Sequence, residues 1–147
     1  MQDNAIALTP APLPSRFAAM LYESLLVTAV VFVASFIIIP VVGDMHAPWQ
    51  RHLFQVYIFG VLFAYFSAFW LRSGQTLAMK TWRIRLVQQN GGSLSFKQAV
   101  LRFVLALLGL LLVGIGFWWA FIDRDKQFLH DRLVGTRLIR VQRKREK

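Results

Sequence analysis

The stretch RFAAMLYESLLVTAVVFVASFIIIPVV, residues 16–42, decides the fold, because a polar leader turns here into a long apolar run. Twenty residues from Ser24 to Gly43 carry no charge, and the apolar run extends backward past Glu23. At about 1.5 Å of rise per residue, residues 21–42 are long enough to cross a hydrocarbon core of roughly 30 Å. We therefore predict a transmembrane helix in this stretch.

Two charges at the start of this run are the first candidates for function. Arg16 and Glu23 are seven residues apart, so at about 3.6 residues per turn they share one helix face. An ionisable group within a membrane span is costly, so it usually faces protein or water and marks function. Simple hydration of Glu23 is the alternative, since a charge costs least near the end of a span.

The composition is that of an integral membrane protein. Of 147 residues, 56% are hydrophobic, and the mean hydropathy is +0.50, which is too apolar for an ordinary soluble domain of this length. Lys and Arg number 17 against seven Asp and Glu. Because these basic residues cluster beside apolar spans, they indicate on which side of the membrane each loop lies. They also suit contact with anionic lipid head groups better than contact with nucleic acid. Cysteine is absent from the sequence, which excludes disulfides and thiolate metal sites.

The regions on either side of the first span are a leader and a second span. Residues 1–15 are predicted to be flexible because their alternating prolines disfavour a helix, and the first span is expected to be retained as an anchor. Residues 53–71 form a second uncharged run of 19 residues. Within it, Gly60, Ala64 and Ala68 recur at every fourth residue, which predicts a smooth stripe for helix packing, with a substrate lining as the alternative.

A polar connection leads from the second span to a third apolar segment at residues 99–122. Ser95 followed by Gln98 fits a capping box, so a helix is predicted to begin just before this segment. Residues 83–87 and 136–141 partly alternate between polar and apolar side chains, as strands do. These two short strands would pair in a small sheet.

The positive charges conflict with three full crossings. Six Lys and Arg lie within residues 72–102 and nine within residues 124–147, and three crossings would place one of these groups outside. If the third segment instead turns at Gly114 and Gly116 and returns, Arg51 is the one Lys or Arg residue that lies outside the membrane. Twenty-four residues are too few for two crossings, so the return would be a re-entrant hairpin. We favour the return, with a single full span as the alternative.

The predicted fold class is therefore an all-α membrane protein with two transmembrane helices, this third apolar segment and a small cytoplasmic two-strand element. Residues 16–141 would form one membrane domain. Residues 142–147 would form a basic tail that lies against lipid head groups or is disordered.

Three motifs follow one another around the apolar spans. They are Arg16 with Glu23, then Gly74-Gln75-Thr76-Leu77 with Ile84-Arg85-Leu86-Val87, and then Leu129-His130-Asp131 with Gly135-Thr136. In this order they resemble the RDD family of small bacterial membrane proteins, which is named for an arginine and two aspartates. Glu23 stands where the first aspartate is usual, and Asp131 matches the second. The resemblance implies a bacterial membrane protein of largely unassigned function that is often suspected of transport.

The leading hypothesis for function is a transport-related, multi-pass protein of the bacterial inner membrane. Glu23 and Asp131 would be acids near the cytoplasmic surface, with Arg16 and Arg102 as counter-charges, and the cluster would bind a proton, a cation or a small ligand. Two or three spans enclose little, so a homo-oligomer or a partner membrane protein is expected. The alternative is a structural or accessory subunit in which the same charges form an ion-pair network.

An enzyme is not expected. His130 and Asp131 are adjacent, so on a helix their side chains point about 100° apart and do not form a dyad. No nucleophile motif or phosphate-binding loop accompanies them in the sequence. His46 and His52 match no metal-ligand spacing, so neither a metal nor a cofactor is predicted.

Overall fold

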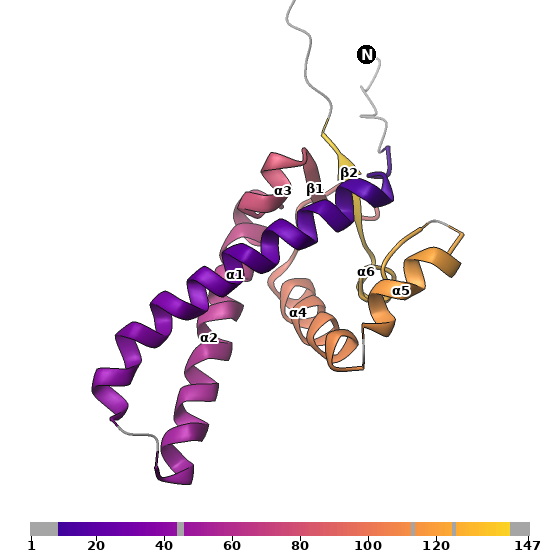
Figure 1. Cartoon of the computed structure of the whole chain (residues 1–147). Coiled ribbons are helices and arrows are strands. Elements are labelled where there is room, and N and C mark those ends of the chain that lie inside the picture. The colour runs from indigo at the N-terminus through magenta and orange to yellow at the C-terminus, as the bar shows by residue number, and fades with distance from the viewer. Residues whose placement is uncertain (1–8, 44–45, 113, 125, 142–147) are drawn as a thin grey trace, which may run out of the picture.

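The structure is a computed structural model that describes residues 9–43, 46–112, 114–124 and 126–141 (Figure 1). Most of the predicted leader, residues 1–8, and the predicted tail, residues 142–147, lie outside the described residues. The elements in chain order are α1 (Leu13–Val42), α2 (Pro48–Arg72), α3 (Leu77–Thr81), β1 (Ile84–Gln88), α4 (Phe96–Leu111), α5 (Ile115–Ile122), α6 (Leu129–Val134) and β2 (Thr136–Arg140).

The helices α1 and α2 form a long hairpin (Figure 1). They contain both predicted spans, and each is long and apolar enough to cross a membrane. Large apolar side chains on α1 are exposed, for example Phe36 at 70% and Val41 at 79%. An apolar surface of this kind is stable in contact with lipid rather than water.

The predicted packing stripe lies on α2. Gly60, Ala64 and Ala68 are all exposed, and a Cβ placed on Gly60 would meet nothing within 4 Å. The stripe is thus exposed among the described residues. Its role in packing between helices stays a prediction.

The third apolar segment is broken into two helices. The helix α4 begins after the predicted capping box, in which the Ser95 hydroxyl accepts from Gln98 N at 3.3 Å and Gln98 Oε1 accepts from Ser95 N at 3.0 Å. Gly114 has φ of 73°, a left-handed conformation that glycine adopts readily, and α5 begins directly after it. Gly116, also predicted to lie in the turn, lies instead within α5.

After this break the chain folds back, because α5 contacts α6 and α6 contacts α4 (Figure 1). The return brings β2 to β1, and the two strands pair antiparallel with Ile84 opposite Arg140 and Gln88 opposite Thr136. The predicted two-strand element is confirmed.

The end of the leader is ordered against this sheet. Pro10 forms a bridge with Ile139, Ala11 N donates to Leu138 O at 3.0 Å, and Arg140 N donates to Thr9 O at 2.9 Å. A proline suits an edge position because it has no N–H to donate. Residues 9–12 of the predicted leader therefore lie beside the sheet and precede α1 directly, and residues 13–15 form the start of α1.

A small core at the sheet end of the molecule joins side chains of α1 to α5 and of both strands. Its most buried apolar side chains include Ile84 and Leu86 of β1, each 1% exposed, and Phe128, which is 2% exposed. Trp70 from the end of α2 and Ala99 from α4 belong to the same core. The charged residues singled out in the sequence lie around this core.

Candidate functional site

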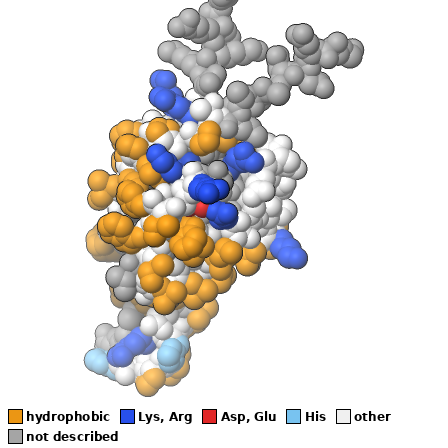
Figure 2. Space-filling view, turned by 90° about the vertical axis from the view of Figure 1, so that its right-hand side faces the viewer, with side chains coloured by type: hydrophobic (Ala, Val, Ile, Leu, Met, Phe, Trp, Pro, Cys, Tyr) orange, Lys and Arg blue, Asp and Glu red, His pale blue; other side chains and the backbone are white. Residues whose placement is uncertain are grey.

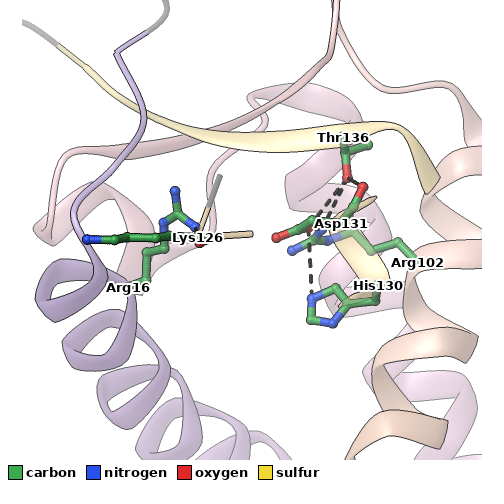
Figure 3. A network of polar contacts seen from close by, with 6 residues as sticks. All are labelled: Arg16, Arg102, Lys126, His130, Asp131 and Thr136. Atoms are coloured by element: carbon green, nitrogen blue, oxygen red, sulfur yellow. Dashed lines mark hydrogen bonds and ion pairs between the residues drawn. The ribbon is translucent and has the colours of Figure 1, made fainter. Parts of the chain in front are cut away.

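A buried ion pair joins Arg102 of α4 to Asp131 of α6. The two residues are 4% and 1% exposed. The hydroxyl of Thr136, at the start of β2, accepts from Arg102 Nη1 at 3.3 Å and donates to Asp131 Oδ1 at 3.4 Å (Figure 3). Three elements therefore meet at one pair of opposite charges.

Two aromatic side chains enclose this ion pair. The Arg102 guanidinium lies 5.0 Å from the centre of the Trp70 ring, within range of a cation–π interaction. The ring of His130 stacks on Phe128 with centroids 5.6 Å apart, and its Nε2 lies 3.8 Å from Asp131 Oδ1. The result is a charged pair inside an apolar shell.

Burial sets the protonation state of the residues around the pair. It lowers the pKa of His130 well below its usual value, and the nearby positive charge of Arg102 lowers this pKa further. His130 is therefore a neutral neighbour of a charged pair.

The motif Leu129-His130-Asp131 with Gly135-Thr136 is explained by this geometry. Gly135 caps the helix α6 with φ of 73°, a left-handed conformation that permits the helix to end abruptly. The chain passes from α6 directly into β2, so Thr136 turns back onto Asp131. A glycine at this position is what brings the two side chains together.

A second site lies around Glu23. This half-buried carboxylate of α1 accepts a hydrogen bond from the Tyr65 hydroxyl of α2 at 2.9 Å and another from the Thr76 hydroxyl. Thr76 is fully buried and also caps α3, where its hydroxyl accepts from Met79 N at 3.3 Å. None of the ion pairs formed within the described ranges includes Glu23.

The motif Gly74-Gln75-Thr76 holds this second site against the sheet. Gly74 has φ of 67°, and its carbonyl accepts from Leu86 N at 2.7 Å. A Cβ on Gly74 would lie 2.5 Å from Leu86 O, so no side chain fits. The Gln75 side-chain amide donates to Ile84 O at 2.7 Å. These contacts fix the start of α3 and so aim Thr76 at Glu23.

The structure does not gather the predicted cluster of Arg16, Glu23, Arg102 and Asp131 into one place. Arg16 donates to the backbone carbonyl of Lys126. In Figure 3, Arg16 lies at the left, whereas the pair of Arg102 and Asp131 lies at the right. Seven residues along a helix separate Arg16 from Glu23 by about 10 Å, so sharing a face does not bring them into contact. Arg16 is therefore not the counter-charge of Glu23.

Sequence reasoning missed two contributors to these sites. Tyr65 carries a hydroxyl inside an apolar helix, and such a group usually finds a hydrogen-bond partner when it is buried. That signal could have marked Tyr65 beforehand. Trp70 stands at the end of the second apolar run, and nothing in the sequence links it to Arg102. In the part of the chain that the structure describes, no group of three His, Asp or Glu side chains could hold a metal ion.

The buried, neutral His130 predicts a pH-dependent stability. An unfolded histidine has a pKa near 6.5, so below about pH 6.5 the unfolded chain binds a proton that the folded chain does not. Stability should fall with falling pH by up to about 1.4 kcal/mol per pH unit until the folded pKa is reached.

Thermal melting in detergent between pH 7.5 and 5.5 measures this effect. The melting temperature of the His130→Asn variant should decrease less on acidification than that of the wild type. A His52→Asn variant changes an exposed side chain and should keep the wild-type slope. Equal slopes in the wild type and in His130→Asn would contradict the prediction.

The sequence was compared with protein families and with known proteins, and this comparison identifies a family. The sequence profile of the RDD family matches residues 10–135. A Rickettsia prowazekii (strain Madrid E) protein named "Uncharacterized protein RP437" is 32% identical over 93 residues, which cover 60% of this chain and 51% of that protein. The chain thus spans about half the length of this curated relative. No solved structure matches the chain. The family match includes all three motifs up to Gly135, and the chain belongs to the RDD family of small membrane proteins.

Proposed function

We propose that this protein has a transport-related role in the bacterial inner membrane and that Glu23 binds a proton or a monovalent cation. The observation that carries the proposal is the setting of Glu23, which accepts from two neutral hydroxyls and has no cationic partner among the described residues. A half-buried carboxylate without a counter-charge is costly, and a bound proton or cation removes that cost.

The surroundings of Glu23 suit such a role. The oxygens of Tyr65 and Thr76 have lone pairs that could face a cation once their protons turn away, so the site contains three oxygen-bearing side chains. They come from α1, α2 and the start of α3, so a small shift of α1 against α2 would alter the site. Neither an enzymatic reaction nor a cofactor forms part of this proposal.

A structural or accessory role is the second candidate, and the Arg102 and Asp131 pair favours it. Asp131 is almost fully buried and already has a counter-charge, so it cannot take up a cation without losing Arg102. We assign this pair to holding α4, α6 and β2 together. The labile charge in the proposal is Glu23 alone.

For the membrane topology, we propose that α1 and α2 cross and that α4 and α5 enter from the cytoplasmic side and return. Lys and Arg side chains gather over the upper part of one face, beside a broad band of hydrophobic side chains (Figure 2). On α4 and α5, Leu111 and Ile122 are 72% and 78% exposed, which suits lipid contact. The exposed stripe of Gly60, Ala64 and Ala68 would allow a second copy or a partner helix to approach closely.

This topology predicts the labelling of single cysteines, which the native sequence does not contain. Cysteines at Ala47, Ser93 and Val141 would be treated with a membrane-impermeant maleimide in intact cells. Only Ala47→Cys should label, whereas all three should label in permeabilised cells. Labelling of Val141→Cys from outside would show that the third segment crosses, and the proposed return would be wrong.

The role of Glu23 predicts the effect of Glu23→Gln, which keeps the size of the side chain and removes its charge. Purified protein in liposomes containing the pH dye pyranine would be given a Na⁺, K⁺ or Li⁺ gradient. The wild type should move protons in response to at least one gradient, and Glu23→Gln should fall to the level of protein-free vesicles.

Ser24→Ala alters the adjacent, exposed residue and should retain the wild-type flux. If Glu23→Gln inserts, melts like the wild type and still exchanges protons, Glu23 does not carry the ion. If the wild type itself moves no protons under any gradient, cation-coupled proton transport is wrong. Loss of the folded protein in Glu23→Gln would favour the structural role.

A further inference from the structure

A pocket rich in basic side chains opens at the sheet end, apart from both sites described above. Its volume is about 990 Å³. It lies between the start of α1, the connection from α5 to α6, and β2. We call this pocket the basic pocket, because its lining includes the basic side chains of Arg16, Arg124, Lys126, Arg132 and Arg137.

Among the described residues, the basic pocket has few compensating charges, and Asp125, which lies between Arg124 and Lys126 in the sequence, is outside the described residues. No acidic side chain belongs to the described lining residues, which otherwise are prolines, glutamines, alanine and leucines. Of the five cations, Arg132 forms an ion pair with Asp123. Among described residues, the other four take part in no ion pair. Several like charges around one hollow repel one another, so an anion bound there would be stabilised.

Two arginines of this pocket also have hydrogen-bonding capacity to spare. Arg16 is 2% exposed and donates through Nη1 to Lys126 O, but its buried Nε has no partner among the described residues. Arg137 donates through Nη2 to Gln89 O at 2.7 Å, and within the described ranges its buried Nε likewise has no partner. A buried donor without an acceptor costs free energy, which a ligand oxygen would recover.

The start of α1 strengthens the positive field of the pocket. Residues Pro10–Pro14 line it, and α1 begins at Leu13 with no side-chain cap at Pro12. The first N–H groups of a helix have no partner within the helix, and a helix of 30 residues carries a partial positive charge at this end. The helix dipole therefore points the same sign of charge into the pocket as the five side chains do.

From these observations we infer that the basic pocket binds a phosphate group carried by a larger molecule. Arginines bind phosphate through paired N–H donors, and phosphate supplies several acceptor oxygens for the unpartnered Nε atoms. The volume exceeds that of a single phosphate and lies within the range of small-molecule sites. The phosphate could belong to the head group of an anionic lipid or to a soluble phosphate ester, because both present the same chemistry.

The test compares wild-type protein with an Arg124→Gln, Lys126→Gln double variant. Both side chains are exposed, so their loss should leave the fold intact, whereas Arg16 also holds the Lys126 carbonyl. The control is an Arg72→Gln, Lys97→Gln double variant, which removes the same charge from exposed positions outside the pocket. Melting temperatures of all three proteins would be measured first.

One arm titrates pyrophosphate into detergent-solubilised full-length protein by calorimetry, and the other adds phosphatidylglycerol in mixed micelles and counts bound lipid by native mass spectrometry. In at least one arm the pocket variant should bind about tenfold more weakly than the wild type, which removal of two charged contacts can account for. The control variant should bind like the wild type.

The arms also identify the source of the phosphate. A response confined to phosphatidylglycerol assigns the pocket to a lipid head group, and one confined to pyrophosphate assigns it to a soluble phosphate compound. If neither ligand binds the wild type, the inference is wrong. It is equally wrong if the pocket and control variants weaken binding to the same extent, because the attraction would then depend only on total charge.

Discussion

The ion pair between Arg102 and Asp131 is the interaction on which the rest of the structure depends. Both residues are nearly inaccessible to water, and a charge buried without its partner is strongly destabilising. Arg102 lies on α4, before the break in the third apolar segment, and Asp131 lies on α6, after it. For the pair to form, α5 and α6 must return towards α4, and that return is what brings β2 beside β1.

The two acids of the sequence pattern occupy contrasting environments and therefore have different chemistry. Asp131 has a guanidinium and a hydroxyl as partners, whereas Glu23 has two hydroxyls and no cation among the described residues. The motif from Gly74 to Thr76 connects them, because it binds β1 on one side and presents Thr76 to Glu23 on the other. The uncharged motif Gly74-Gln75-Thr76 thus holds in place a carboxylate that has no cationic partner among the described residues.

Much of the fold follows from local signals in the sequence. The length of the apolar runs predicts α1 and α2, and Ser95 and Gln98 predict the start of α4. Three full crossings would place two basic segments on opposite sides of the membrane, which favours a break at Gly114. The partners of the charges could not be predicted in the same way. Helical periodicity identifies a shared face, but it does not reveal that Arg16 reaches Lys126 or that Arg102 reaches Asp131. The pairing of residues 9–11 with β2 uses backbone groups, which leave no pattern of side chains.

The measurement that tests the central role of the ion pair most directly is a double-mutant cycle. Arg102→Met, Asp131→Asn and the double variant would be compared by thermal unfolding in detergent, with Lys97→Met as an exposed control. Each single variant should lose about 3 to 5 kcal/mol, because it leaves one buried charge or polar group without its partner. The double variant should lose clearly less than the sum of the two single losses. Additive losses would contradict the account, since they would mean that Arg102 and Asp131 stabilise the protein independently of each other.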